Sequence, residues 1–217
     1  MDKKEHNKLI AKIAKSIFKP EGIIRKGQSR VWLDDNDWYT TVIEFQPSNW
    51  GRGSYLNVGV NFNWYAKDYF SFDIGGRIKP FNEFKDKDDF EKVITEYCET
   101  TLKTVSDFRK KLNNINNSTK FMTTSLSDQN IWGNYHLAIF YGLTGDKINS
   151  EKHFNKVLES DDDWDWIIEL KKRVSKSILK LNSVNDFNSI IADIIIDTRQ
   201  QKKLKEITKE EVLKHWA

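Results

Sequence analysis

The sequence has few of the residues and motifs that carry recognisable chemistry. It has one cysteine, Cys98, among 217 residues, which excludes an internal disulfide and a cysteine-based zinc site. Its four histidines form no His-x-x-x-His pair, and His136 and His153 would at most make a polar contact across a predicted helical hairpin. The nucleophile-elbow, phosphate-loop and dinucleotide motifs are missing. We therefore expect no metal, no cofactor and no catalytic residue, which favours a binding protein over an enzyme.

Long hydrophobic runs and an excess of one charge are also missing. No stretch of about 18 apolar residues could cross a membrane. The amino terminus is charged and lacks the apolar centre of a signal peptide, so we expect a cytoplasmic protein without membrane contact. The 35 basic and 32 acidic residues leave a net charge of +3, which is small for a protein dedicated to binding nucleic acid. The 38% of hydrophobic residues are enough for a folded core.

The amino-terminal half has the patterns of an α+β domain. Apolar residues at helical spacing from Leu9 to Ile17 stop before Pro20 and predict an amphipathic helix. Strands are predicted at 30–33, 38–46, 55–64 and 69–74. We expect a four-stranded antiparallel meander, with Phe70 and Phe72 on its apolar face. A helix predicted over 88–112 would cover that face and leave the other one open to a partner.

The carboxyl-terminal half is predicted to be a helical bundle. The asparagine-rich segment 113–119 favours a boundary, which gives domains at 1–112 and 120–217. Helices are predicted at 128–143, 149–159, 164–181 and 186–204, with a short one that begins at a Thr208–Glu211 capping box. The segment 138–157 resembles one tetratricopeptide-type helical hairpin, although a single copy is more typical of an ordinary helix pair.

A family resemblance covers about residues 5 to 112. It is carried by the segment 22–27 with its Arg-Lys pair, by Val-Ile-Glu-Phe-Gln-Pro-Ser-Asn at 42–49, and by Tyr-Leu-Asn-Val-Gly-Val at 55–60. In this order the segments resemble the bacterial domain of unknown function family 4304. The resemblance implies a compact fold in which a sheet packs on helices, and it implies no activity.

Two acidic groups could hold a metal ion. Asp34, Asp35 or Asp37 with Glu44 resembles the carboxylates of divergent metal-dependent nucleases, but aspartate is also typical of turns. The run of aspartates within 161–165 lacks the glycine and the terminal glutamate of a calcium loop. It is more typical of a helix start, where the macrodipole favours negative charge.

Aromatic residues are the stronger indication of function. Eight tryptophans are present, and tryptophan, tyrosine and arginine dominate binding hot spots. Trp50 is the sharpest candidate, because Gly51-Arg52-Gly53 beside it makes a tip with an aromatic ring and a cation. The competing interpretation is that Trp50 folds back over the sheet edge. The candidate partner-binding residues are Trp50, Arg52, Trp38, Trp164 and Trp166.

Two functions from different classes remain open. The first is an intracellular module that binds another protein, such as an immunity-type or regulatory partner of a bacterial effector or defence system. The second is a nucleic-acid-directed factor, either a binder or a degenerate nuclease, that uses Arg25, Lys26, Arg30 and Arg52. We favour the first, because the basic charge is spread thinly and the exposed aromatic tip suits a protein partner.

Overall fold

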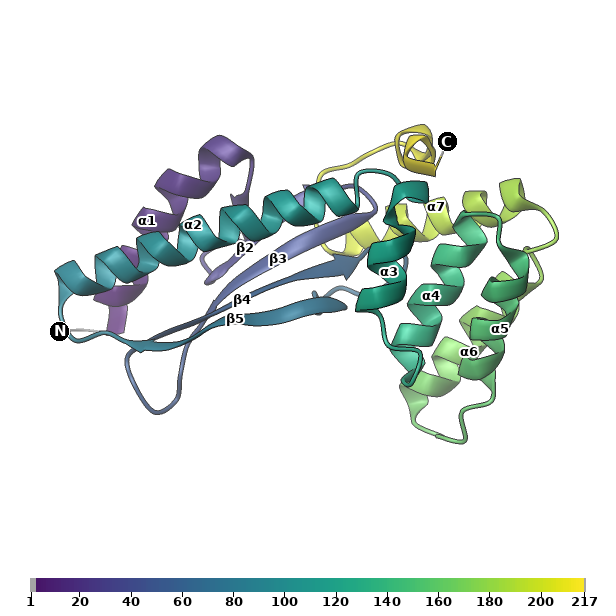
Figure 1. Ribbon diagram of the computed structural model, residues 1–217, viewed down its shortest axis with the longest axis horizontal. Helices are drawn as coiled ribbons and strands as arrows, with labels where there is room; N and C mark the ends of the chain where they lie inside the picture. Colours follow the sequence, from purple (N-terminus) through teal and green to yellow (C-terminus); the bar gives the residue numbers. More distant parts are fainter. Residues whose placement is uncertain (1–2, 217) are drawn as a thin grey trace. The chain divides into compact units, whose positions relative to one another are not determined.

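The computed structural model describes residues 3–216 and is an α+β protein with one five-stranded antiparallel sheet. The chain forms two compact units, 1–62 with 70–110 and 63–69 with 111–217 (Figure 1). The short segment 63–69 follows a strand of the first unit yet belongs to the helical second unit, which the sequence did not indicate. Among residues 3–216, no helix is both long enough and apolar enough to span a membrane.

The first unit holds the sheet and two helices. Its elements are α1 (Lys3–Phe18), β1 (Ile24–Arg25), β2 (Val31–Asn36), β3 (Tyr39–Gln46), β4 (Gly53–Phe62), β5 (Ile74–Glu83) and α2 (Lys87–Lys111), with a 3-10 turn at Lys19–Glu21. The strands lie side by side in chain order, and each is antiparallel to the next. The predicted meander is therefore present.

The number and position of the strands differ from the prediction. The two-residue strand β1 pairs with β2 and raises the number from four to five. The strand predicted at 69–74 is wrong, because the last strand is β5. Its Gly75, Gly76 and Pro80 are typical of turns, which hid it. Pro80 is tolerated because β5 is an edge strand and its register with β4 shifts between Ser54 and Leu56.

One face of the sheet packs against α1 and α2, which lie on the same side of it (Figure 1). Phe18 of α1 contacts Trp32 and Phe45, with ring centroids 5.5 and 6.3 Å apart. The Tyr97 hydroxyl of α2 donates to the carbonyl oxygen of Pro80 at 2.8 Å. Seven strand residues of this face are at most 2% exposed: Trp32, Ile43, Phe45, Leu56, Val58, Val60 and Phe62. The predicted apolar face of β4 is confirmed.

The opposite face is not fully open. Phe72 lies against Gly59 on this side, because a Cβ atom at position 59 would meet the Phe72 ring at 2.6 Å. The side-chain oxygen of Asn61 accepts the backbone N–H of Ser71 at 3.1 Å, and Asn61 is fully buried. The connection between β4 and β5 therefore covers part of the face that the alternation left open. The expectation that Phe72 lies on the apolar face is wrong.

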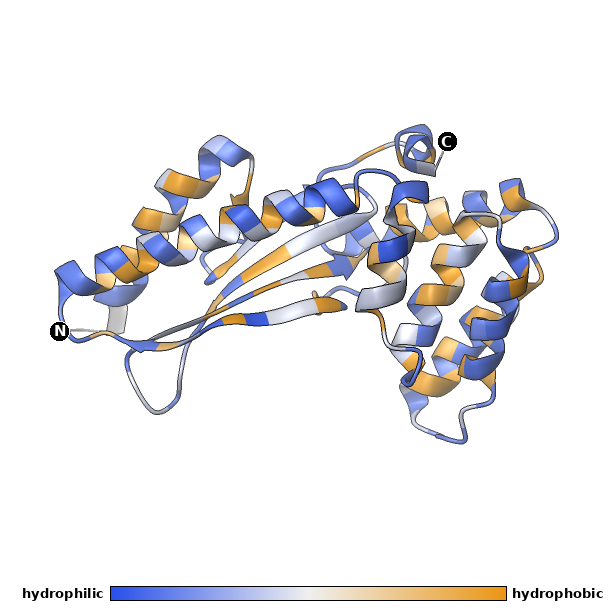
Figure 2. Ribbon diagram, viewed as in Figure 1, coloured by the Kyte–Doolittle hydropathy of each residue, from blue (hydrophilic) through white to orange (hydrophobic). Residues whose placement is uncertain are grey.

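The second unit is helical. Its helices are α3 (Thr119–Ser125), α4 (Ile131–Leu143), α5 (Lys147–Leu158), α6 (Asp165–Ile178), α7 (Val184–Gln201) and α8 (Lys209–Leu213), with 3-10 turns at Asn116–Ser118 and Lys214–Trp216. Figure 2 shows α4 as more hydrophobic than its neighbour α5, and most of its residues are buried. Gly142 lets α4 approach α7, since a Cβ atom there would lie 2.4 Å from the Phe187 ring. The capping box of Thr208 and Glu211 is confirmed.

The helical hairpin of α4 and α5 is joined by polar contacts. The Ser150 hydroxyl donates to the carbonyl oxygen of Ala138 at 2.7 Å. His153 Nδ1 bonds to the side-chain oxygen of Asn134 at 2.8 Å. His136 Nδ1 accepts from the indole N–H of Trp64 at 2.9 Å. The two histidines are therefore each hydrogen-bonded to another residue, His136 to Trp64 and His153 to Asn134.

Candidate functional site

The connection between β3 and β4, residues 47–52, is the most exposed aromatic feature of the first unit, and we call it the Trp50 loop. It projects away from the sheet at the lower left of Figure 1. Trp50 is 98% exposed at its tip, so the interpretation in which this ring folds back over the sheet edge is wrong. The Ser48 hydroxyl accepts the Trp50 backbone N–H at 3.1 Å and shapes the tip. Trp50 is thus available to a partner.

The base of the Trp50 loop is held tightly against β5 and β2. The carbonyl oxygen of Arg52 accepts the Phe84 backbone N–H at 2.7 Å. The carbonyl oxygen of Gly53 accepts from Arg30 Nη1 at 3.1 Å. Gly53 has φ +153°, and a Cβ atom there would lie 2.0 Å from the carbonyl oxygen of Asn82. Only glycine fits this close approach, so Gly53 fixes where the loop begins its return.

A cavity of about 510 Å³ lies at the base of the Trp50 loop, and we call it the basic cavity. Its lining residues are His6, Asn7, Arg30, Pro47, Ser48, Asn49, Trp50, Gly51, Arg52 and Gly53. All of them belong to the first unit. Among the residues that the structure describes, the lining has two arginines and a histidine but no carboxylate, so the cavity favours an anionic group. Its volume is in the range of sites that hold a small ligand or part of one.

Within residues 3–216, the hydrogen bonds of the Arg30 side chain all go to neutral groups, and none goes to a carboxylate. Its Nε donates to the side-chain oxygen of Asn7 at 2.6 Å, and its Nη2 reaches Asn7 and His6 Nε2. Its Nη1 donates to the carbonyl oxygens of Phe45 and Gly53. Burial lowers the pKa of the Arg30 guanidinium, and no carboxylate offsets this effect. The positive charge of Arg30 is therefore held in place and left uncompensated.

His6 and Arg52 complete the cationic lining. The His6 ring is 6% exposed and packs against the Phe84 and Phe90 rings, at centroid distances of 5.9 and 6.4 Å. Burial, Arg30 and Arg52 each lower the pKa of His6, which keeps its imidazole neutral. The Arg52 side chain is exposed, and within residues 3–216 it makes neither a hydrogen bond nor an ion pair. A cation without a partner thus stands beside the exposed Trp50.

Trp38 does not belong to this site. It is fully buried, with its ring stacked on Phe62 at 5.9 Å and edge-on to Tyr39 at 4.9 Å. Trp38, predicted to begin a strand, is the second residue of the two-residue turn after β2; Asp37 before it adopts φ +61° and the Trp38 indole is buried in the core. The prediction that Trp38 binds a partner is therefore wrong in this structure.

Trp164 and Trp166 form a separate aromatic cluster in the second unit. They are 66% and 41% exposed. Trp166 stacks on Trp132 at 5.4 Å with 7° between the ring planes. The Arg173 guanidinium lies over the Tyr65 ring at 4.7 Å and donates to the backbone of 63–69. Asp165 stands in the first turn of α6, as predicted for the acidic run. These tryptophans are partly used for packing, whereas Trp50 is not.

The carboxylates of the nuclease interpretation do not converge. Asp34 is 3% exposed and forms an ion pair with Arg109 of α2, on the helix-covered face. Glu44 pairs in register with Val31, and side chains alternate along a strand, so Glu44 lies on the opposite face. Glu44 there accepts from Asn57 at 2.8 Å. Within residues 3–216 no group of three metal-ligating side chains comes together, at the hairpin or at 161–165.

The sequence missed the residues that connect α1 to the Trp50 loop. His6 and Asn7 lie more than twenty positions before Arg30 and more than forty before Trp50, and no local pattern joins them. It also missed a polar cluster on the uncovered part of the sheet. Arg77 there donates to Gln46 at 2.9 Å and stacks on Tyr55 at 4.0 Å. Only the pairing of strands brings such residues together.

Comparisons with known proteins identified no relative of this chain. No protein-family model, no curated protein and no solved structure matches this chain. The resemblance to the domain of unknown function family 4304 therefore stays a prediction. The function must be argued from the site.

Proposed function

We propose that this protein is a binding module that recognises another protein through the Trp50 loop. The observation that carries this proposal is Trp50 itself, 98% exposed at the tip of a loop whose base is fixed. An exposed indole costs solubility unless a partner covers it, and tryptophan and arginine are the residues most enriched in binding hot spots. A rigid loop base lowers the entropy lost on binding. Trp50 and Arg52 are the proposed centre of the interface.

The proposed setting is the cytoplasm of a bacterial cell, where the protein would act as an immunity-type or regulatory partner of an effector or defence protein. The basic cavity makes an acidic group on the partner the best match, because its lining within residues 3–216 has no carboxylate. Such a group would enter beside Arg52 while Trp50 packs on a neighbouring apolar surface. The partner would in this way contact both an aromatic ring and a cation.

Affinity capture from the native cell tests the proposal. The tagged protein should recover a specific protein that survives nuclease treatment, and the purified pair should bind directly. Trp50→Ala or Arg52→Ala should weaken this pair by about 1 to 2 kcal/mol, the loss typical of a hot-spot residue. Trp164→Ala is the matched control, because it removes an exposed indole from the second unit. A loss with Trp164→Ala and none with Trp50→Ala would overturn the assignment to the Trp50 loop.

A nucleic-acid-directed function is the second candidate. It is favoured by exposed lysines spaced along one face of α1, at Lys8, Lys12 and Lys15, and by Lys19 in the turn that follows. Three of them line a further cavity of about 530 Å³ that also includes Arg25. Nuclease treatment separates the two functions, since a complex bridged by nucleic acid disappears and a direct protein contact stays.

A further inference from the structure

The protonation of His6 follows from its contact with Arg30. A guanidinium has only N–H donors, so His6 Nε2 accepts from Arg30 Nη2. Neutral His6 must then carry its proton on Nδ1. This N–H is buried and has no acceptor among residues 3–216. Buried donors are nearly always paired, and His6 is among the residues that line the basic cavity.

The charges around the cavity indicate which kind of acceptor would suit this N–H. All five N–H groups of Arg30 are used by neutral acceptors, so Arg30 supplies a fixed positive charge but no free donor. Arg52 has free donors at the mouth of the cavity. No carboxylate is found among the described lining residues. A ligand group with two negative charges would therefore neutralise the positive charges of Arg30 and Arg52. A phosphomonoester has a charge of about −1.5 to −2 at pH 7 and three acceptor oxygens.

We propose that the basic cavity binds the phosphate group of a phosphomonoester. Arg52 and the Nδ1–H of His6 donate to its oxygens, and Arg30 holds the positive potential behind them. The Phe84 and Phe90 rings pack against the His6 imidazole. Trp50 at the rim packs on whatever carries the phosphate. The inference rests on the proposed function in one respect: the phosphate group belongs to the molecule that the Trp50 loop binds.

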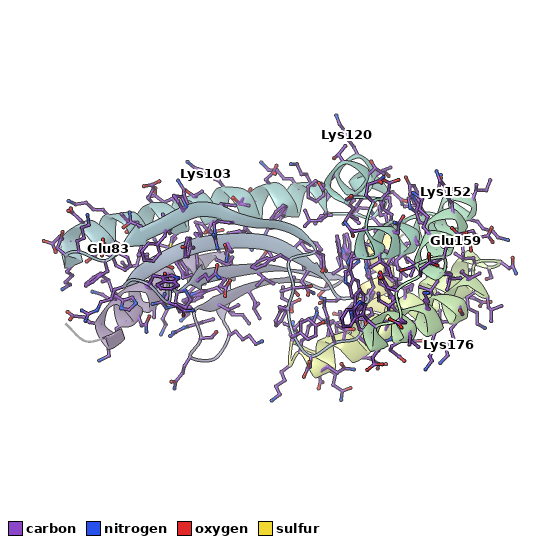
Figure 3. The ribbon with its side chains drawn as sticks, turned by 90° about the horizontal axis from the view of Figure 1, so that it is seen from below. Glu83, Lys103, Lys120, Lys152, Glu159 and Lys176 are labelled. Atoms are coloured by element: carbon purple, nitrogen blue, oxygen red, sulfur yellow. The ribbon has the colours of Figure 1, made fainter. Side chains whose placement is uncertain are left out.

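Calorimetric titration with inorganic phosphate at pH 7.5 tests the cavity alone. Phosphate should bind with a dissociation constant of about 1 mM or below, and Arg52→Gln should weaken it about tenfold or more. Lys103→Gln is the matched control: it removes the same charge from an exposed residue of α2 (Figure 3) and should leave binding unchanged. Equal weakening by the two variants, or no phosphate binding, would overturn the proposal. Acetate that binds as tightly as phosphate would also overturn it.

Nitrogen NMR of His6 tests the donor without relying on affinity. The free protein should show the Nδ1–H tautomer, and its proton signal should move when phosphate is added. His6→Phe keeps an aromatic ring packed against Phe84 and Phe90 but removes the donor, so it should weaken phosphate binding while the protein stays folded. A His6 signal that is unchanged at saturating phosphate would contradict the assignment.

Two probes distinguish the source of the phosphate. A phosphoserine peptide represents a modified partner protein, with the serine peptide as its control, and adenosine monophosphate represents a free nucleotide, with adenosine as its control. The tighter of the two identifies the source, and its binding should be weakened by Trp50→Ala. If phosphate binds but no partner is captured from cells, the protein-binding function fails and the anion site stands. If a partner is captured and phosphate does not bind, the anion site fails and the protein-binding function stands.

Discussion

Arg109 of α2 and Asp34 of β2 form an ion pair in the first unit, with 2.5 Å between Nη2 and Oδ1. Arg109 Nε reaches the second oxygen of the same carboxylate at 3.2 Å, and Nη2 also donates to the carbonyl oxygen of Glu21. The hydrogen bond that Arg109 donates to the Asp34 carboxylate raises the pKa of the Arg109 guanidinium. One residue thus ties the covering helix to the sheet and to the turn after α1. Asp34 has a structural partner, which is why it is not free to hold a metal ion.

Arg109→Ala should therefore destabilise the protein. Its removal leaves the Asp34 carboxylate buried without its charged partner, which costs about 1.5 to 3 kcal/mol. The cost stays below that of a fully buried pair because the Arg109 side chain is 36% exposed. Urea unfolding measures this change. Lys92→Ala, which breaks the exposed Lys92–Asp89 pair of the same helix, should leave the midpoint unchanged. Equal stability of both variants would contradict a structural role for Arg109.

The two faces of the sheet predict unequal effects for two phenylalanines. Phe62 is fully buried and stacks on Trp38, so Phe62→Ala should cost about 3 to 5 kcal/mol through lost burial and a cavity. Phe72 is 36% exposed on the opposite face, so Phe72→Ala should cost clearly less. Thermal unfolding of the two variants checks the order. If Phe72→Ala proved the more damaging, the assignment of the faces would be wrong.

Alanine substitutions at Gly53 and Gly76 distinguish the cost of a steric clash from the cost of backbone strain. Both glycines have φ near +150°, a conformation that side chains rarely adopt. A Cβ atom at 53 would lie 2.0 Å from Asn82, whereas one at 76 would meet nothing within 4 Å. Gly76→Ala should cost about 1 to 3 kcal/mol from strain alone, and Gly53→Ala should cost more. Denaturant unfolding measures both. Equal losses would show that the base of the Trp50 loop can move to make room.

The sequence predicted the parts of the fold that depend on local periodicity. The apolar face of β4, the long helix α2 and the capping box at Thr208 all follow from spacing within one segment. It failed where distant contacts override local composition. Pro80 and two glycines are accommodated in an edge strand, and Trp38 is drawn from a turn into the core.

The candidate site was predicted in part, for the same reason. Trp50 and Arg52 could be identified because the composition of a loop can be read from one short segment of the sequence. The basic cavity did not, since His6 reaches Arg30 only after α1 has packed beside the sheet. A charge arrangement made by tertiary packing leaves no mark in the spacing of one segment.

Acid should destabilise the protein through two histidines. His6, beside Arg30 and Arg52, and His153, beside Lys152 and Lys156, both have a pKa lowered from 6.5, with burial as the largest cause. In each case the unfolded chain binds a proton at a higher pH than the folded protein does.

Stability should therefore be highest above pH 6.5 and fall as the pH drops below that value, until the folded protein also takes up the protons. The carboxylate of Asp128 opposes the effect at His153, so His6 should contribute the clearer slope. Melting temperatures measured between pH 7.5 and 5.5 check this, and His6→Phe should flatten the profile. Phosphate in the basic cavity should flatten it as well, because an anion beside His6 offsets the two arginines. A melting temperature that rises as the pH falls through this range would contradict the neutral, buried state assigned to His6.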